Sequence, residues 1–249
     1  MAMSLQERGL DLLQRIEEYI NQQNGYETDG HALYTMPFSM TVGGRSSCGK
    51  TYFVKELLKD LREGEGYSLH TVVFYGTDQS MYDEMNIDEK YEGLNQFVEV
   101  VSKLEQHDVN AKGEKVDLQS KQRIQPVIII DDLMTEVIKH PDVCNKITRG
   151  ISHEGLTMIL IYQNLLPQAR YTRNIAMNVH YKVCFYNSAS ARQFHYVVME
   201  MDSGKKTLID MYRRLGAEGM RGPLVIDCLK HLAWYGVRPD SVISLHDKP

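Results

Sequence analysis

The residues best suited to chemistry lie in the stretch GRSSCGKT, positions 44 to 51. Its two glycines, lysine and threonine fit the pattern G-x-x-x-x-G-K-[ST], in which backbone N–H groups surround phosphate oxygens. In this pattern the lysine reaches the outer phosphates and the following hydroxyl binds Mg2+, so we expect these roles for Lys50 and Thr51. The expected nucleotide contacts are Gly44, Arg45, Ser46, Ser47, Cys48, Gly49, Lys50 and Thr51.

Two adjacent carboxylates, Asp131 and Asp132, end the apolar run VIIIDD. Ligands of open α/β sheets lie outside the carboxyl ends of the strands, so we expect this pair beside the phosphate loop. Asp131 is predicted to hold Mg2+ through water, and Asp132 to orient or deprotonate the attacking water. A GTPase or a nucleotide kinase can work without a base carried by a strand. The pair therefore favours hydrolysis of ATP coupled to mechanical work.

A further apolar run, LTMILIYQ, ends in Gln163 and is followed by Asn164. If its strand lies beside the first strand, Gln163 and Asn164 can sense the γ-phosphate and pass its loss to the following loop. Alternatively, Gln163 merely caps a strand, as amides commonly do. Three arginines flank this run, at positions 149, 170 and 173. An arginine inserted from a neighbouring subunit of a ring can neutralise charge in the transition state. For each arginine taken alone, however, a surface or DNA contact is the favoured interpretation.

A parallel sheet is needed to bring these strand ends together. Apolar runs rich in β-branched residues predict strands at 37–42, 69–76, 126–132, 156–163 and 180–187. Helical spacing of apolar residues predicts helices at 3–23, 50–63, 91–106 and 205–216. Short apolar strands that alternate with helices predict an α/β fold with a mostly parallel central sheet flanked by helices.

Three segments follow one another along the chain. Residues 1–35 are predicted to form an amphipathic N-terminal helix and a linker, 36–200 the nucleotide-binding core, and 201–249 a C-terminal extension of the same domain. The polar stretch 107–125 is predicted to be a mobile loop, because loops of this length are usually functional or disordered. No apolar run is long enough for a membrane span, and the N-terminus is charged where a signal peptide is apolar, so we expect neither export nor membrane anchoring.

Composition limits the partners that we expect. The 249 residues are 43% hydrophobic and 24% charged, which is ordinary for a globular protein. A net charge of -5 argues against a protein that coats nucleic acid with its whole surface. Residues 145–192, however, hold six basic residues and one acid, and such a local basic segment suits a polyphosphate track such as DNA. Its arginines could equally serve subunit contacts and ATP. The four cysteines form no CxxC pair and are predicted to be free thiols in a reducing compartment.

Four stretches carry a family resemblance: GGRSSCGKTYF, VVFYGTDQSMYDEM, PVIIIDDLM and ITRGISHEGLTMILIYQNLLPQARYTRNIAMNVHYKVCFYN. Together they resemble the genome-packaging ATPases of large double-stranded DNA viruses and polinton-type elements, within the FtsK/HerA superfamily. The resemblance covers residues 36–190, and its most specific parts are the TRG–SH–QN–N–HY series and YG..Q..YDEM. It implies a RecA-like P-loop NTPase core that forms a homo-oligomeric ring at a viral capsid vertex and drives double-stranded DNA inward.

The resemblance also implies roles for single residues. The phosphate loop matches its first nucleotide motif, Asp131 and Asp132 match the second, and Gln163 matches the polar sensor. Arg149 falls in the TRG segment and is the first choice for the arginine finger, with Arg173 second. The implied cofactors are ATP and Mg2+. The implied place of action is the interior of a host cell, in the nucleus or a cytoplasmic virus factory, with association with the virion as a further option.

One departure from the family concerns the phosphate loop. It carries Arg45 and Cys48 where the family often has small or proline residues, as in GPSGSGKT. This puts the nucleotide affinity in question. Cys48 is either a thiol-sensitive point beside the phosphates or a small residue that fits, and the second interpretation is favoured.

Other functions share some of these features. A HerA-like or conjugative DNA translocase of cellular origin has the same motor. The compact length and the TRG to HY series nevertheless favour the interpretation as a viral packaging ATPase. A nucleotide-binding interaction module would bind ATP without turning it over. A small-molecule kinase would need a site for an acceptor other than water, and no such site can be recognised in the sequence.

Overall fold

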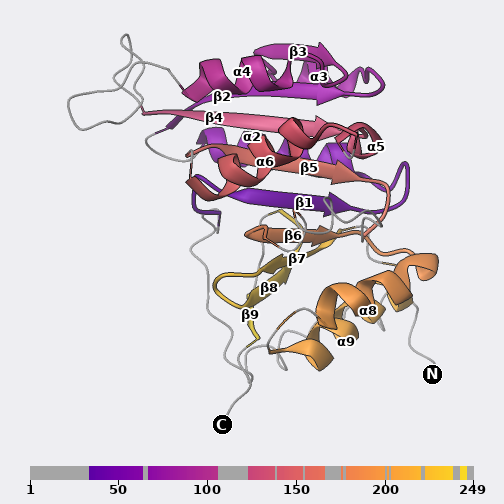
Figure 1. Cartoon of the computed structure of the whole chain (residues 1–249). Coiled ribbons are helices and arrows are strands. Elements are labelled where there is room, and N and C mark those ends of the chain that lie inside the picture. The colour runs from indigo at the N-terminus through magenta and orange to yellow at the C-terminus, as the bar shows by residue number, and fades with distance from the viewer. Residues whose placement is uncertain are drawn as a thin grey trace, which may run out of the picture.

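One sheet of nine strands runs through the described residues of the computed structural model (Figure 1). The structure describes residues 34–63, 67–105, 123–137, 139–153, 155–165, 175, 178–199, 201, 203–219, 222–237 and 242–245. The predicted N-terminal helix, most of the predicted loop at 107–125, and the arginines at 170 and 173 lie outside these residues. The strand order is β3-β2-β4-β5-β1-β6-β7-β8-β9.

The first six strands of this order are parallel. They are β1 (Ser39–Gly43), β2 (Tyr67–Tyr75), β3 (Glu89–Glu92), β4 (Arg123–Asp131), β5 (Thr157–Tyr162) and β6 (Tyr181–Cys184). Strands β1, β5 and β6 are buried along their whole length, which explains why their sequences are continuous apolar runs rather than alternating ones. The predicted mostly parallel α/β fold is therefore confirmed.

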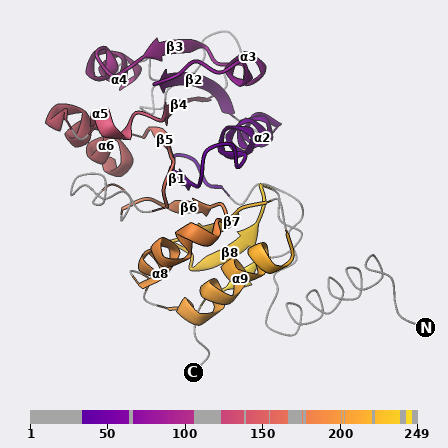
Figure 2. The ribbon, with the colours of Figure 1, turned by 90° about the vertical axis from the view of Figure 1, so that its right-hand side faces the viewer.

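Helices cover both faces of the parallel part, as Figure 2 shows with the sheet edge-on. One face carries α2 (Lys50–Glu63) and α3 (Met81–Glu84). The other carries α4 (Phe97–Glu105), α5 (Met134–Val137) and α6 (Pro141–His153). One stripe of apolar residues of α2 is buried against the sheet: Phe53, Val54, Leu57, Leu58 and Leu61. This stripe fixes the helix that follows the phosphate loop in place.

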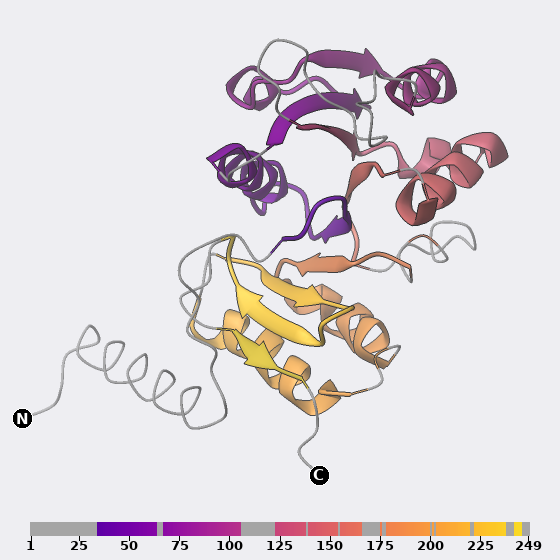
Figure 3. The same cartoon turned by 90° about the vertical axis from the view of Figure 1, so that its left-hand side faces the viewer.

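The C-terminal residues extend the same sheet with antiparallel strands, where the sequence signal was too short to assign. These strands are β7 (Leu224–Asp227), β8 (Leu232–Tyr235) and β9 (Ile243–Ser244). The short helix η1 (Ser188–Ser190), α8 (Ala191–Met199) and α9 (Lys205–Ala217) precede them, and Figure 3 shows α8 and α9 behind the yellow strands. A separate apolar cluster joins these helices to the strands. The division of the chain at residue 200 stays a prediction.

Two expectations about local structure were wrong. Residues 89–92 form strand β3, and the helix predicted from 91 begins only at Phe97. In the sequence EKYE partly buried and exposed residues alternate, which is the pattern of an edge strand, and Gly93 ends it with a left-handed φ of 68°. Residues 123–125, predicted as the end of a loop, belong to β4.

Three further predictions concern Lys182, the cysteines and membrane-spanning helices. Lys182 is only 7% exposed in β6, so it does not contribute to a basic surface, contrary to its place in the basic segment. All four cysteines are free, as predicted. Within the described ranges, no helix combines the length and the apolar character needed to cross a bilayer.

Candidate nucleotide and magnesium site

The phosphate loop connects the end of β1 to the start of α2. Gly49 has a left-handed φ of 101°, a conformation that residues with a side chain rarely adopt. Gly44 has another constraint, because a Cβ there would lie 2.6 Å from Cβ of Phe185. The N–H of Gly44 also donates to the carbonyl of Tyr162 at 3.3 Å, which ties the loop to the end of β5. Both glycines of the motif are therefore required, Gly49 by its backbone conformation and Gly44 by the close packing of Phe185.

Lys50 is the first residue of α2 and is 8% exposed. Its ammonium donates hydrogen bonds to the carbonyl oxygens of Gly44 and Arg45, both at 2.9 Å. These bonds hold the charged group within the loop, where the positive end of the helix dipole adds to the attraction for an anion. The lysine is thus placed to meet a phosphate at the start of the helix.

Asp131 is the last residue of β4 and is 4% exposed. Its Oδ2 accepts hydrogen bonds from the hydroxyl of Tyr82 at 2.8 Å, the amide of Gln79 at 3.2 Å and the hydroxyl of Thr51 at 3.4 Å. Burial raises the pKa of this carboxyl above its usual range, while the hydrogen bond from Tyr82 acts in the lowering direction. The carboxylate that was predicted to hold Mg2+ therefore lies beside the predicted Mg2+-binding hydroxyl.

Asp132 leaves the strand in a left-handed conformation, with φ 58°, and is exposed. Both of its carboxylate oxygens accept from Nε2 of Gln163, at 2.8 and 2.9 Å. The contact forms because β5 lies between β1 and β4, with Ile161 of β5 opposite Asp131. The condition set for Gln163, that its strand lies beside the first, is met.

These side chains surround one pocket of about 560 Å³ at the carboxyl ends of the parallel strands. Its volume is in the range of small-molecule sites. The lining residues are Ser46, Ser47, Gly49, Lys50, Thr51, Tyr52, Thr77, Gln79, Met81, Asp131, Asp132, Ile161, Tyr162 and Gln163. Most of the residues predicted to contact the nucleotide or the metal are therefore brought together.

Some of the predicted residues are not among the described residues that line the pocket. The described lining of the pocket does not include Gly44, Arg45 or Cys48. Cys48 is partly buried against the apolar cluster on the α2 face of the sheet, and this burial raises the pKa of its thiol. This packing agrees with the interpretation of Cys48 as a small residue that fits. Arg149 lies in α6, with its side chain outside the part that the structure describes.

Sequence reasoning missed the contribution of residues 77–82. Thr77, Gln79 and Met81 line the pocket, and Gln79 and Tyr82 donate to Asp131. The motif YG..Q..YDEM, which includes Gln79 and Tyr82, carries part of the family resemblance. It was the signal that could have pointed to this part of the site.

The geometry fits a nucleotide with Mg2+. The loop offers N–H groups and an ammonium to phosphates, while the nearby oxygens of Thr51 and Asp131 are the hard ligands that Mg2+ prefers. Mg2+ in such sites is usually bound by one or two carboxylates together with substrate phosphates. Asp132 lines the same pocket, so its carboxylate is within the space where the phosphates would lie.

Comparison with known families and structures adds two findings. The profile of the family described as "Poxvirus A32 protein" matches residues 26–226, most of the chain. This match bears out the resemblance to viral genome-packaging ATPases. No curated protein matches the chain.

Among solved structures, the DNA-packaging ATPase B204 of Sulfolobus turreted icosahedral virus is 12% identical, with a TM-score of 0.52. That match covers 82% of this chain and 98% of B204. The cytoplasmic domain of the type VII secretion ATPase EccC from Thermomonospora curvata is 10% identical, with a TM-score of 0.52, and the match covers 85% of this chain and 27% of that one. At such low identity these likenesses show the fold alone, which is that of P-loop ATPases.

Proposed function

This chain belongs to the poxvirus A32 protein family, and we propose that it is an ATP-driven motor that moves double-stranded viral DNA into a preformed capsid. One observation carries the proposal: the phosphate loop and the two carboxylates at the end of β4 line the same pocket. This combination provides for hydrolysis of a nucleotide rather than for binding alone. The fold that the chain shares with a viral DNA-packaging ATPase supports DNA as the substrate that the motor moves. Its place of action would be the interior of an infected cell.

Each side chain of the pocket has a role in the proposed reaction. Lys50 and the N–H groups of the loop bind the phosphates. Thr51 and Asp131 would hold Mg2+, which neutralises charge on the phosphates. Asp132 orients a water molecule and accepts its proton, while Gln163, held against both oxygens of Asp132, would sense the γ-phosphate.

Hydrolysis stimulated by DNA is the direct test of the motor. Wild-type protein should hydrolyse ATP faster when double-stranded DNA is added. Asp132→Asn should lower this rate by roughly 10²-fold or more, because the substitution removes the base. A phosphate-release assay with and without DNA measures both effects. A wild-type rate no higher than that of the variant would contradict the motor and favour a nucleotide-binding interaction module.

A homo-oligomeric ring at the capsid vertex is part of the proposal, with Arg149 acting on the ATP of the neighbouring subunit. Arg149→Ala protein should still bind ATP but lose hydrolysis, because the charge that stabilises the transition state is missing. Mixing it with Lys50→Ala subunits should restore part of the activity, since some interfaces then combine an intact loop with an intact arginine. Unimpaired hydrolysis by Arg149→Ala would rule out this assignment and direct the same experiment to Arg173.

A further inference from the structure

The motif YG..Q..YDEM begins at the last residue of β2 and continues into the segment before β3. The proposed reaction gives its residues no role. Within it the N–H of Tyr82 donates to the carbonyl of Gln79 at 3.0 Å, at the start of α3. This turn brings the two side chains together, and both donate to the same oxygen, Oδ2 of Asp131. The motif therefore serves the carboxylate that was predicted to hold Mg2+.

The hydrogen bonds to Asp131 are unevenly distributed. Tyr82, Gln79 and Thr51 all donate to Oδ2, and no side chain in the described ranges donates to Oδ1. Three donors on one oxygen restrict rotation of the carboxylate about its bond to Cβ. One oxygen is thus committed to the protein, and the other is left for a metal ion or its water.

Burial strengthens this arrangement. Tyr82 is 1% exposed and Asp131 is 4% exposed, so their 2.8 Å hydrogen bond lies in a medium of low dielectric. Bonds from a donor to a charged acceptor are the strongest class of hydrogen bond in proteins.

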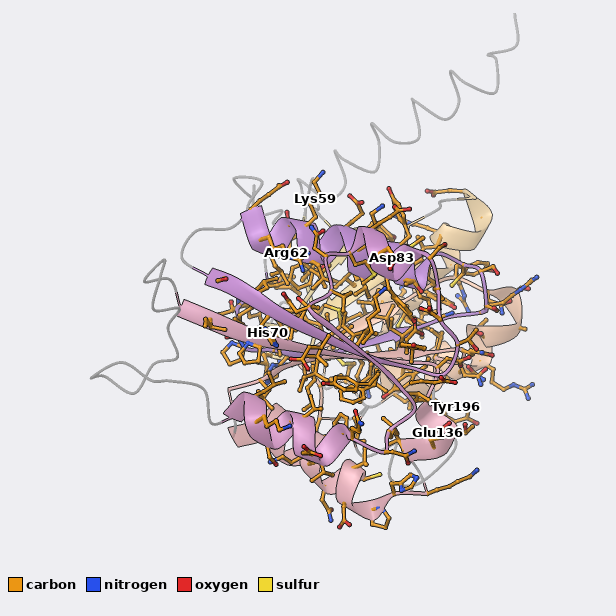
Figure 4. The ribbon with its side chains drawn as sticks, turned by 90° about the horizontal axis from the view of Figure 1, so that it is seen from above. Lys59, Arg62, His70, Asp83, Glu136 and Tyr196 are labelled. Carbon is orange, nitrogen blue, oxygen red and sulfur yellow. The ribbon has the colours of Figure 1, made fainter. Side chains whose placement is uncertain are left out.

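Two contacts anchor the segment to α2, the helix that begins with Lys50. Arg62 donates to the carbonyl oxygens of Met85 and Asn86, both at 2.8 Å. Lys55 forms an ion pair with Glu84 of α3. Figure 4 shows Arg62 and Asp83, from α2 and α3, on the same side of the sheet. The phosphate-loop helix and the support of Asp131 are therefore packed as one unit.

We propose that Gln79 and Tyr82 are positioning residues that set the affinity of the site for Mg2+ by fixing the carboxylate of Asp131. The inference rests on the proposed ATPase function and adds to it the groups that orient the metal ligand. Outer partners of metal ligands commonly change metal affinity by about 10- to 100-fold when they are removed. A conservative substitution of Tyr82 should therefore act on Mg2+ and not on the nucleotide itself.

The test measures binding of a non-hydrolysable ATP analogue by calorimetry, first with a metal chelator and then over a series of Mg2+ concentrations. Tyr82→Phe should raise the Mg2+ concentration needed for half-maximal tightening by roughly 10-fold and leave the affinity in chelator unchanged. Gln79→Met should produce a smaller rise, roughly 3-fold, because it removes a longer hydrogen bond. Binding is measured without turnover, so hydrolysis does not enter the result.

Tyr75→Phe is the matched control. The Tyr75 ring centroid lies 5.7 Å from that of Tyr82, but its hydroxyl makes no hydrogen bond within the described part of the chain. This control should bind Mg2+ and the analogue like wild type. If Tyr82→Phe weakens analogue binding equally with and without Mg2+, or changes neither, the positioning role is overturned. A wild-type protein that binds no analogue in either condition would instead overturn the proposed ATPase function.

Discussion

The pocket has two sides that differ in how their carboxylate is held. On the metal side, Asp131 is buried, and three side chains donate to one of its oxygens. On the water side, Asp132 is exposed, and a single amide, that of Gln163, donates to both of its oxygens. A metal ligand must keep one geometry, whereas a group that handles water must remain accessible to solvent. Two residues of the same type, adjacent in sequence, thus have different surroundings, and these suit the two roles proposed for them.

The largest expected effect separates the two sides directly. Asp131→Asn and Asp132→Asn should each lower hydrolysis by roughly 10²-fold or more, because both carboxylates are needed for turnover. Only Asp131→Asn should also abolish the tightening of nucleotide binding by Mg2+. Hydrolysis rates and titrations of a non-hydrolysable ATP analogue with and without Mg2+ give both quantities for each variant. Equal loss of Mg2+-dependent binding in the two variants would mean that the sides are not distinct.

A smaller effect is expected from the amide on the water side. Gln163→Leu removes the donor to Asp132 with little change in volume and should slow hydrolysis by roughly 10-fold, while Mg2+-dependent binding stays as in wild type. Asn164→Leu is the matched control, since this neighbouring exposed amide makes no hydrogen bond to Asp132 among the described residues. Stopped-flow measurement of phosphate release compares the two. A Gln163→Leu rate equal to that of the control would mean that Gln163 only caps its strand.

The sequence predicted one side of the pocket better than the other. The phosphate loop, helix 50–63 and the carboxylate pair are local patterns, each read from a few consecutive residues. To place Gln163 at the site, only the strand order was needed, because in a parallel sheet its strand either lies beside the first strand or does not. Gln79 and Tyr82, by contrast, meet Asp131 across about 50 positions of sequence. Their contact depends on how α3 packs on the sheet, and no local periodicity encodes that packing.

The same limit applies to the ends of the sheet. Strand β3 has only four residues and lies at an edge, so its alternation was too short to outweigh the helical pattern that follows it. Strands β7 and β8 are equally short, and they are buried because α8 and α9 cover them. In these places tertiary packing decides the structure, whereas the long apolar strands at the centre of the sheet can be recognised from their own sequences.

The smallest expected effect is on stability. Because burial raises the pKa of Asp131, the folded protein binds this proton more tightly than the unfolded chain does, so the ionised carboxylate lowers the free energy of unfolding at pH values above the raised pKa. Without nucleotide and Mg2+, Asp131→Asn should therefore raise Tm at pH 7 by roughly 1–4 °C, and the gain should shrink as the pH falls through that pKa. Asp132→Asn, at an exposed position, should change Tm little.

Calorimetric melting curves of wild type and both variants at several pH values measure these differences. Adding nucleotide with Mg2+ should reverse the order of wild type and Asp131→Asn, because Asp131→Asn lacks the tight Mg2+-dependent binding that stabilises the other two proteins. If Asp131→Asn instead lowered Tm at pH 7 without ligand, the hydrogen bonds from Tyr82 and its neighbours would outweigh the effect of burial. The ionised Asp131 would then stabilise the free protein. Asp131 would differ from Asp132 in the number of its hydrogen-bond donors rather than in the unfavourable burial of its charge.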